Sequence, residues 1–356
     1  MKKVVLTGGG TAGHVTPNIA LMPELKKRGC TISYIGSYEG MEKDMIIETG
    51  TPYYGIATGK FRRYFDLKNF TDPFRVIKGY FEAKSHLKKI KPDVVFSKGG
   101  FVAVPVVRAA SALKIPVIIH ESDMTPGLAN KICIPCAQKV CCNFPETMQY
   151  LPKDKAVLTG SPIRSELFEG SKAKGLAFCG FNNKKPVLLI VGGSLGAVAV
   201  NNAIRAILPE LLKKYQVIHL CGKGKTDASL NGTPGYVQYE FIKDELRDLM
   251  AAADVVISRA GANAICELLA LRKPNILIPL PAGSSRGDQI LNAESFKKQG
   301  FSYLLPEEDI TNEKLLAIIN EVYENRVSYE KTMSASNQNQ AIDIIAGLIE
   351  ELSESK

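Results

Sequence analysis

Glycine-rich loops mark the places in this sequence where phosphate could be bound. Gly8, Gly10 and Gly13 satisfy the spacing G-x-G-x-x-G, directly after an apolar run and before a helical stretch. Glycines permit a tight turn and a close approach of the backbone to a ligand, and the start of the following helix attracts phosphate. Further loops of this kind lie at 97–101 (SKGGF), 192–196 (GGSLG) and 258–263 (SRAGAN). Loops in both halves of the chain favour two phosphate-bearing ligands over a single nucleotide.

The first glycine loop lacks the acidic partner that a nicotinamide dinucleotide would need. Enzymes that bind such a cofactor place an acid on its ribose at the end of the second strand. Here that strand ends Tyr34-Ile35-Gly36-Ser37, and Glu39 lies further on. The spacing therefore weakens the dinucleotide interpretation of this loop.

His14 stands between the first glycine loop and the helix that follows. It is one of four histidines, with His86, His120 and His219. A lone histidine is more often structural, but this placement favours a chemical role. The string HESDM, which begins at His120, is not the zinc-protease motif HExxH, because position 124 is methionine.

The eight cysteines do not predict a metal site. Cys133 and Cys136 have C-x-x-C spacing, but no second pair and no histidines follow at a comparable spacing. The adjacent Cys141 and Cys142 would form a poor chelate. Since most of the eight lie in apolar stretches, we expect them to pack in the core of a protein from a reducing compartment.

Short β-rich runs that alternate with helical stretches must position these loops. The runs lie at 2–8, 31–36, 93–100, 115–121 and 139–144 in the first half, and at 186–194, 215–224, 237–242, 254–261 and 274–281 in the second. Unbroken apolar runs are typical of parallel strands covered by helices on both faces. We therefore expect an α/β fold of two doubly wound, Rossmann-like domains that face each other across a cleft.

Length and composition agree with two globular domains. The chain has 356 residues, of which 45% are hydrophobic and 23% charged, and one domain takes about 150 residues. Gly160 and Pro162 interrupt the pattern, which predicts domains at 1–163 and 164–336. The last helix, at about 337–356, follows a second domain that is already complete, so we expect it to return to the first.

No stretch of the sequence is a candidate for crossing a membrane, which would need about 20 largely apolar residues. The segment MKKVVLTGGG runs straight into a strand and shows no apolar signal segment. These features predict a cytoplasmic protein.

Basic residues are concentrated in the window 60–91. Ten basic and three acidic residues give this window +7 of the net charge of +9. The helix expected there from Pro73 carries two apolar stripes. One stripe is sufficient to pack against a core, and the second is flanked by lysines. The second stripe and its flanking lysines are Phe74, Ile77, Phe81, Lys78 and Lys84. This pattern favours an anionic bilayer surface; the alternative is a wide core face with solvated lysines. Nucleic acid is a weaker rival, because no recognised binding module is present.

Seven segments carry a resemblance to a known family. In chain order they are GGGTAGHVTP, SKGGF, HESDMTPGLANK, GSPIR, GGSLGA, SRAGANAICE and RGDQILNA. With this order and spacing, residues 1 to about 296 resemble the MurG-type N-acetylglucosaminyltransferases of peptidoglycan synthesis. The resemblance implies a GT-B fold and an inverting transfer of N-acetylglucosamine from UDP-N-acetylglucosamine. The acceptor would be the 4-hydroxyl of undecaprenyl-pyrophosphoryl-N-acetylmuramoyl-pentapeptide, which converts lipid I to lipid II.

The resemblance also implies roles for individual residues. Such a transfer needs a base for the proton of the acceptor hydroxyl, and His14 is the first candidate, with Glu121 second. The donor set is Thr11, Ala12, Gly13, Asp123, Arg164, Ser194, Ile242, Ala262, Asn263, Glu267, Asp288 and Gln289. The acceptor set is Gly99, Gly100 and Asn130.

Within the donor set, the family pattern gives six residues a particular part of the ligand. Arg164 and Ser194 would contact the diphosphate, and Glu267 would accept hydrogen bonds from both ribose hydroxyls. Ile242 would bind uracil through its backbone. Asp288 and Gln289 would hold sugar hydroxyls; a helix N-cap region is the alternative for both.

Two features of the sequence refine this expectation. Asp123 stands where the family often has Asn, and a carboxylate can only accept where an amide can also donate, which puts this contact in doubt. No Asp-x-Asp is present to hold a metal ion. Backbone N–H groups, helix N-termini and cations would then meet the diphosphate charge, so we expect no cofactor and no metal.

The expected partners are UDP-N-acetylglucosamine, the lipid-linked muramoyl-pentapeptide, anionic inner-leaflet lipid and other cell-wall synthesis proteins, without nucleic acid. The expected location is peripheral, on the cytoplasmic face of the cell membrane. Four alternatives stay open. They are another UDP-sugar transferase with a lipid acceptor such as diacylglycerol, a UDP-N-acetylglucosamine epimerase, a nicotinamide-dependent oxidoreductase and a non-enzymatic nucleotide-binding module.

Overall fold

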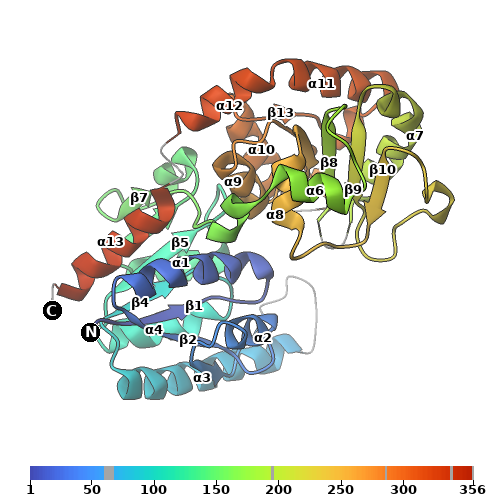
Figure 1. Ribbon diagram of the computed structural model, residues 1–356. Helices are drawn as coiled ribbons and strands as arrows, with labels where there is room; N and C mark the ends of the chain where they lie inside the picture. The colour runs from blue at the N-terminus through green and yellow to red at the C-terminus, as the bar shows by residue number, and fades with distance from the viewer. Residues whose placement is uncertain (60–67, 194–195, 285–286, 337–339, 355–356) are drawn as a thin grey trace. The chain divides into compact units, whose positions relative to one another are not determined.

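Two compact units, each built on its own parallel sheet, make up the protein (Figure 1). The computed structural model describes residues 1–59, 68–193, 196–284, 287–336 and 340–354. The first unit comprises Met1–Arg164 with Gln338–Lys356, and the second comprises Ser165–Asn337. This division falls one residue from the boundary expected from the sequence.

The first unit has seven parallel strands in the order β3-β2-β1-β4-β5-β6-β7. Their bounds are β1 Lys3–Thr7, β2 Thr31–Ser37, β3 Tyr53–Ile56, β4 Val94–Ser97, β5 Val117–Glu121, β6 Lys139–Cys142 and β7 Ala156–Leu158. In the centre, Val5 of β1 pairs with Ser33 of β2 and with Val95 of β4. The strand order reverses between β1 and β4, which is the edge where open α/β sheets bind ligands.

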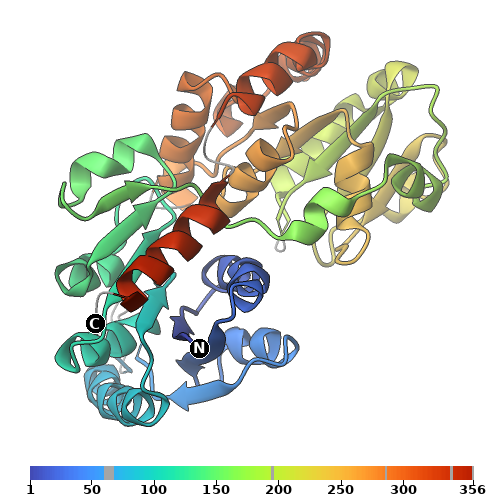
Figure 2. The ribbon, with the colours of Figure 1, turned by 60° about the vertical axis from the view of Figure 1, so that its left-hand side comes forward.

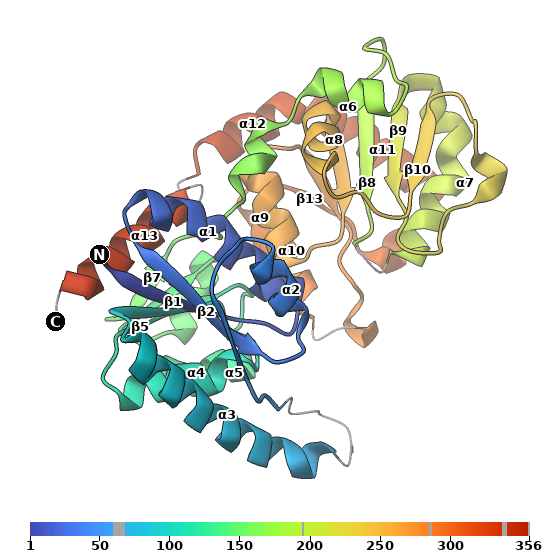
Figure 3. The ribbon, with the colours of Figure 1, turned by 60° about the horizontal axis from the view of Figure 1, so that its bottom comes forward.

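Helices cover both faces of the first sheet (Figure 3). Their bounds are α1 Thr16–Lys27, α2 Met41–Ile47, α3 Lys68–Ile90, α4 Ala103–Ala112, α5 Leu128–Cys133 and α13 Ala341–Glu354. Successive strand residues point to opposite faces. Val4 and Leu6 accordingly pack in the core beneath α1 and α13, while Val5 packs in the core beneath α3 and α4.

The last helix, α13, belongs to the first unit, where Figure 2 shows it in red beside the blue N-terminal elements. Ile345 and Ile349 are fully buried in the same core as β1 and α1. At the end of α1, Arg28 donates to Glu350 at 2.9 Å and to Asp343 at 3.1 Å. Apolar burial and this ion-pair cluster together hold the helix in place.

The second unit repeats the plan with six parallel strands in the order β10-β9-β8-β11-β12-β13. The strands are β8 Val187–Val191, β9 Gln216–Leu220, β10 Tyr236–Tyr239, β11 Val255–Ser258, β12 Asn275–Leu277 and β13 Tyr303–Leu304. The helices are α6 Lys172–Phe178, α7 Val198–Lys214, α8 Leu246–Ala252, α9 Ala262–Ala270, α10 Asp288–Lys298, α11 Asn312–Glu324 and α12 Arg326–Ser334. Leu188 and Ile190 of the central strand pack in one core with α7 and α11.

Helix α3 begins at Lys68, five residues before the start expected at Pro73. A proline inside a helix removes one backbone hydrogen bond but does not by itself stop the chain from being helical before it. The proline therefore marks a favoured start rather than the actual one. No helix in the described part of the chain is long and apolar enough to cross a membrane.

Candidate functional site

The two glycine loops of the first unit meet at the reversal of strand order. A Cβ atom on Gly100 would collide with the carbonyl oxygen of Gly9 and lie 3.1 Å from Nδ1 of His14. Gly100 also has a φ of 79°, which a side chain would strain. A residue other than glycine would push the loops apart, so the sequence brings the candidate base and an acceptor-loop glycine into contact.

His14 ends a short 3-10 turn, Ala12–His14, that joins the first loop to α1. Burial, followed by the positive charge of Lys98, lowers its pKa to about 4. Thr11 Oγ1 lies 2.9 Å from Nδ1 of the ring. When Nδ1 carries the proton, it can donate a hydrogen bond to Thr11 Oγ1, and Nε2 keeps a lone pair. At neutral pH the ring is therefore uncharged and able to take up a proton.

Glu121, the second candidate base, is buried at the end of β5 with both carboxylate oxygens engaged. It accepts hydrogen bonds from the backbone N–H groups of Asp123 and Gly127, each at 3.0 Å. It also accepts from Nδ2 of Asn130 at 2.8 Å. These contacts shape the loop between β5 and α5, so the geometry favours His14 over Glu121 as the base.

The predicted acceptor residues share one corner of the first unit. A Cβ atom on Gly99 would lie 2.9 Å from Oδ1 of Asn130, which places these two residues in contact. Since Asn130 is oriented by Glu121, the loops after β4 and β5 form one connected surface beside His14. Asp123 is partly buried in the same loop.

A buried carboxylate that the sequence analysis missed supports the first glycine loop. Glu42, in the first turn of α2, accepts from the backbone N–H of Ser37 at 3.1 Å and of Gly10 at 3.3 Å. The Ser37 hydroxyl donates to the same carboxylate. This acid follows the second strand, but it binds the protein's own loop instead of a ribose. Glu42 lies further from the strand end than Glu39, so the spacing of the dinucleotide-binding motif does not identify it.

In the second unit, the donor residues predicted on α9 stand at the carboxyl end of β11. The helix begins at Ala262, so Asn263 and Glu267 lie within its first two turns, and both are partly buried. Arg259, just before this helix, donates to the carbonyl oxygens of Ile278 and Pro279 at 3.0 and 3.1 Å. Arg259 thereby fixes the loop after β12 to the start of α9.

Helix α10 is joined to the same two loops. It begins at Asp288, after Gly287 in the left-handed conformation with a φ of 81°. Oε1 of Gln289 accepts from the backbone N–H of Leu280 at 3.1 Å, and Asn292 donates to the Ala260 carbonyl at 3.2 Å. The structure therefore brings together the predicted residues of α9 and α10 at one edge of the second sheet.

The remaining predicted donor residues are more scattered. Thr11 and Ala12 are exposed and Gly13 is partly buried on the first loop. Arg164, which ends the first unit, and Ile242, after β10, are partly buried. Ser194 lies outside the described residues.

Comparison with known proteins assigns the chain to a family. The N-terminal domain of glycosyltransferase family 28 matches residues 4–142, and the C-terminal domain of that family matches residues 187–348. The chain belongs to glycosyltransferase family 28. Its two Rossmann-like sheets and its likeness to solved glycosyltransferases confirm the predicted α/β GT-B fold.

Relatives match this family 28 chain over nearly its whole length. The UDP-N-acetylglucosamine--N-acetylmuramyl-(pentapeptide) pyrophosphoryl-undecaprenol N-acetylglucosamine transferase of Lachnoclostridium phytofermentans is 68% identical over 352 residues, 99% of each chain. The protein of the same name from Lachnospira eligens is 65% identical over 351 residues, again 99% of each. The crystal structure of Acinetobacter baumannii MurG has a TM-score of 0.76 at 27% identity, covering 99% of this chain and 100% of that one. The predicted resemblance is confirmed.

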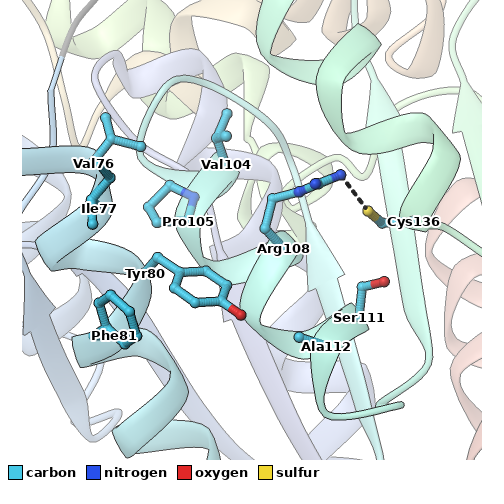
Figure 4. A pocket seen from close by; sticks show the side chains of 10 residues that line it. All are labelled: Val76, Ile77, Tyr80, Phe81, Val104, Pro105, Arg108, Ser111, Ala112 and Cys136. Atoms are coloured by element: carbon cyan, nitrogen blue, oxygen red, sulfur yellow. Dashed lines mark hydrogen bonds between the residues drawn. The ribbon is translucent and has the colours of Figure 1, made fainter. Parts of the chain in front are cut away.

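A separate surface lies on α3 and α4 of the first unit. The exposed fractions of Phe74, Ile77 and Phe81 are 74%, 55% and 62%, whereas Ala83 and Leu87 are fully buried. The second apolar stripe is therefore not a core face. Ten residues line a cavity of about 510 Å³ between the helices (Figure 4): Val76, Ile77, Tyr80, Phe81, Val104, Pro105, Arg108, Ser111, Ala112 and Cys136.

Proposed function

We propose that this protein transfers N-acetylglucosamine from UDP-N-acetylglucosamine to the 4-hydroxyl of undecaprenyl-pyrophosphoryl-N-acetylmuramoyl-pentapeptide, the step from lipid I to lipid II in peptidoglycan synthesis. The observation that carries this proposal is the 68% identity, over 99% of both chains, to an enzyme named for this transfer. The neutral histidine beside two glycine loops supports it, because the acceptor hydroxyl must lose a proton as it attacks.

The reaction would proceed by direct displacement. His14 accepts the proton of the acceptor hydroxyl through Nε2, and the oxygen attacks the anomeric carbon as its bond to UDP breaks. An α-linked donor then gives a β(1→4) product with inversion. Glu121 acts by shaping the loop that carries Asn130, through the three hydrogen bonds it accepts.

Donor binding is assigned mainly to the second unit and to Arg164, while Thr11, Ala12, Gly13 and Asp123 are the other donor residues expected in the first unit. Glu267 would accept hydrogen bonds from the ribose hydroxyls, which a carboxylate near a helix start is suited to do. The start of α9 at Ala262 and Asn263 offers backbone N–H groups to the diphosphate as its charge develops. With cations such as Arg164, these groups would make the transfer independent of a metal ion.

We further propose that the enzyme works as a peripheral protein at the cytoplasmic face of the cell membrane. Its acceptor carries a long lipid, so the reaction belongs at a bilayer surface. The exposed stripe Phe74, Ile77 and Phe81, with Lys78 and Lys84 on the same helix, has the chemistry that binds anionic inner-leaflet lipid.

One assay tests the proposed reaction and its rivals. Labelled UDP-N-acetylglucosamine is incubated with the lipid-linked muramoyl-pentapeptide, with and without EDTA, and the labelled lipid product is measured. We expect equal product in both. Two parallel reactions replace the acceptor by diacylglycerol or omit it. Transfer to diacylglycerol instead would favour another lipid-acceptor transferase, and conversion of the donor without acceptor would favour an epimerase. Loss of activity in EDTA would overturn the metal-independent mechanism.

A further inference from the structure

The carboxylate of Glu42 is fully buried, although a charged group is costly to remove from water. Hydrogen bonds from the protein's own backbone and from one hydroxyl offset this cost. Oε1 accepts from the backbone N–H of Ser37 at 3.1 Å and from the Ser37 hydroxyl, and Oε2 accepts from the backbone N–H of Gly10 at 3.3 Å. The carboxylate thus joins α2 to the end of β2 on one side and to the first glycine loop on the other.

The first glycine loop is shaped to receive this carboxylate. A Cβ atom on Gly9 would lie 2.6 Å from Cδ of Glu42, so a side chain at this position would displace the acid. Gly10 has a φ of 85°, a left-handed conformation that glycine adopts without strain. These two glycines therefore allow contact with an internal acid, and not only the close approach of a ligand.

The peptide group between Gly9 and Gly10 connects Glu42 to the candidate base. Its N–H donates to Glu42, and its carbonyl oxygen points the opposite way because the peptide is planar and trans. The His14 ring lies on that opposite side. A Cβ atom on Gly100 would contact both the Gly9 carbonyl oxygen and Nδ1 of His14, and the ring forms a hydrogen bond with the Gly9 backbone. Since a carbonyl oxygen can only accept, the nitrogen that faces it must carry a proton.

Thr11 completes this arrangement from the next position of the loop. Its Oγ1 lies 2.9 Å from the same ring nitrogen, Nδ1 of His14. Thr11 is joined directly to Gly10, whose N–H is held by Glu42, so the position of the hydroxyl depends on that hydrogen bond. With the proton on Nδ1, Nε2 keeps the lone pair that the transfer needs.

A different side chain fixes the second glycine loop. Nζ of Lys98 donates to Ser122 Oγ at 2.7 Å and lies 2.6 Å from Nδ1 of His120. These contacts join the ends of β4 and β5, which lie on the other side of β1 from β2. Glu42 therefore acts on the first loop through contacts separate from those that fix the loops after β4 and β5.

We propose that Glu42 is a positioning residue for the transfer: it holds the first glycine loop so that the proton of His14 stays on Nδ1 and Nε2 is left to accept the proton of the acceptor hydroxyl. The proposal rests on the proposed role of His14 as the base. Glu42 acts on the ring through the peptide group of Gly9 and Gly10 and through Thr11. It orients a histidine as the acid of a catalytic triad does, but with a peptide group between the two side chains.

The test determines which nitrogen of His14 carries the proton, by nitrogen-15 NMR at neutral pH without substrate. The chain has only four histidines, and a His14→Gln variant identifies the His14 signals. In the unaltered protein we expect the proton on Nδ1. Glu42→Gln keeps the size of the side chain but turns an NH₂ group toward one of its donors. Because Ser37 offers two donors and Gly10 one, we expect the amide oxygen to stay with Ser37 and the contact with Gly10 to be lost.

In Glu42→Gln we therefore expect His14 to be protonated partly on Nε2. In the transfer assay kcat should fall by about 10²-fold, the loss that a small misplacement of a reacting group can cause. Glu39→Gln, at an exposed acid just before α2, is the matched control and should change neither readout. In a Thr11→Val background, Glu42→Gln should lower kcat by a much smaller factor, because both changes act on the same ring.

Three results would overturn the proposal. One is a His14 protonated on Nε2 in the unaltered protein, which needs no variant and so holds even if Glu42→Gln does not fold. Another is a folded Glu42→Gln variant, checked by circular dichroism, whose His14 proton is still entirely on Nδ1. The third is full additivity of Glu42→Gln and Thr11→Val in kcat, which would mean that Glu42 acts elsewhere. The NMR readouts do not use the transfer reaction, so they stay separate from a failure of the proposed function.

Discussion

The protonation state of His14 limits the chemistry at the scale of single residues. A base must be unprotonated to act, and the pKa of His14 is lowered to about 4, first by burial and then by Lys98. The ring is therefore neutral throughout the physiological range. An unshifted histidine would already be about half charged near pH 6.5.

Replacement of His14 by alanine is expected to lower kcat by about 10²–10⁴-fold, the contribution of a positioned general base. The acid limb of the pH–rate profile should lie near pH 4 in the unaltered enzyme and be lost with the ring. Steady-state kinetics over a range of pH measures both. If the His14→Ala variant changed only the acceptor KM, His14 would be a binding residue, and Glu121 would again be the candidate base.

A second prediction at the residue scale concerns Glu267 and the binding of the donor. In Glu267→Ala, the donor KM should rise by about 10- to 150-fold, because hydrogen bonds to a charged group contribute about 1.5–3 kcal/mol. The acceptor KM should change little. Glu313→Ala, an exposed acid on α11 of the same unit, serves as the matched control. An unchanged donor KM in the folded Glu267 variant would remove the ribose assignment.

Local spacing predicts some of these residues and hides others. Gly8, Gly10 and His14 were found because a turn, a close approach and a helix start impose a pattern within a few positions. Glu42 was missed because it lies beyond the position at the strand end that the motif specifies, and Lys98 was missed because its partner lies on another strand. Lys98 meets His120 only because β4 and β5 are neighbours in the sheet, and no local motif records that pairing.

At the scale of elements, the strands that the sequence did not predict are edge strands. β3, β7 and β13 each close one side of a sheet. Most of their residues are partly buried or exposed, and β13 has only two residues. A strand covered on both faces forms a continuous apolar run, and the short strands β3, β7 and β13 lack such a run. The fourth edge strand, β10 at Tyr236–Tyr239, was predicted from the run at 237–242. The central strands were all predicted for the same reason.

Helix α13 gives a prediction at this scale. Ile349 is fully buried against β1 and α1, so Ile349→Ala should destabilise the first unit by about 2–5 kcal/mol. Hydrogen exchange of amides in β1 and β4 measures this effect, with β8 of the second unit as the internal reference. Glu354→Ala removes only an ion pair to Lys2 on a side chain that is 71% exposed, and should leave the exchange of these amides nearly unchanged, because solvent screens an exposed pair. Unaltered exchange in Ile349→Ala would mean that α13 contributes little stability.

At the scale of the whole molecule, fold and family could be predicted because many weak signals agreed. The alternation of β-rich runs with helical stretches predicted the α/β class from the residues alone. The seven ordered segments then narrowed it to one family, which the relatives confirm. The distribution of charge is a property of the same scale, since +7 of the net +9 lies within residues 60–91.

That concentration of charge leads to the prediction for the membrane. Each basic residue near an anionic bilayer contributes about 1 kcal/mol, and salt weakens this contribution. We therefore expect binding to vesicles that contain anionic lipid, with affinity falling as salt rises. In the double variant Phe74→Ser with Phe81→Ser, binding should be lost while transfer to a soluble, short-chain acceptor persists. Both side chains are mostly exposed, so the fold should survive.

The control for this experiment is Phe168→Ser, which removes an aromatic side chain that is 57% exposed on the second unit. Vesicle co-sedimentation at two salt concentrations compares the three proteins, and circular dichroism checks that each is folded. We expect Phe168→Ser to bind as the unaltered protein does, because that surface lies outside the basic window. Equal losses in both variants would indicate nonspecific adsorption through any exposed aromatic group. Retention of binding in the double variant would place the lipid-binding surface elsewhere on the protein.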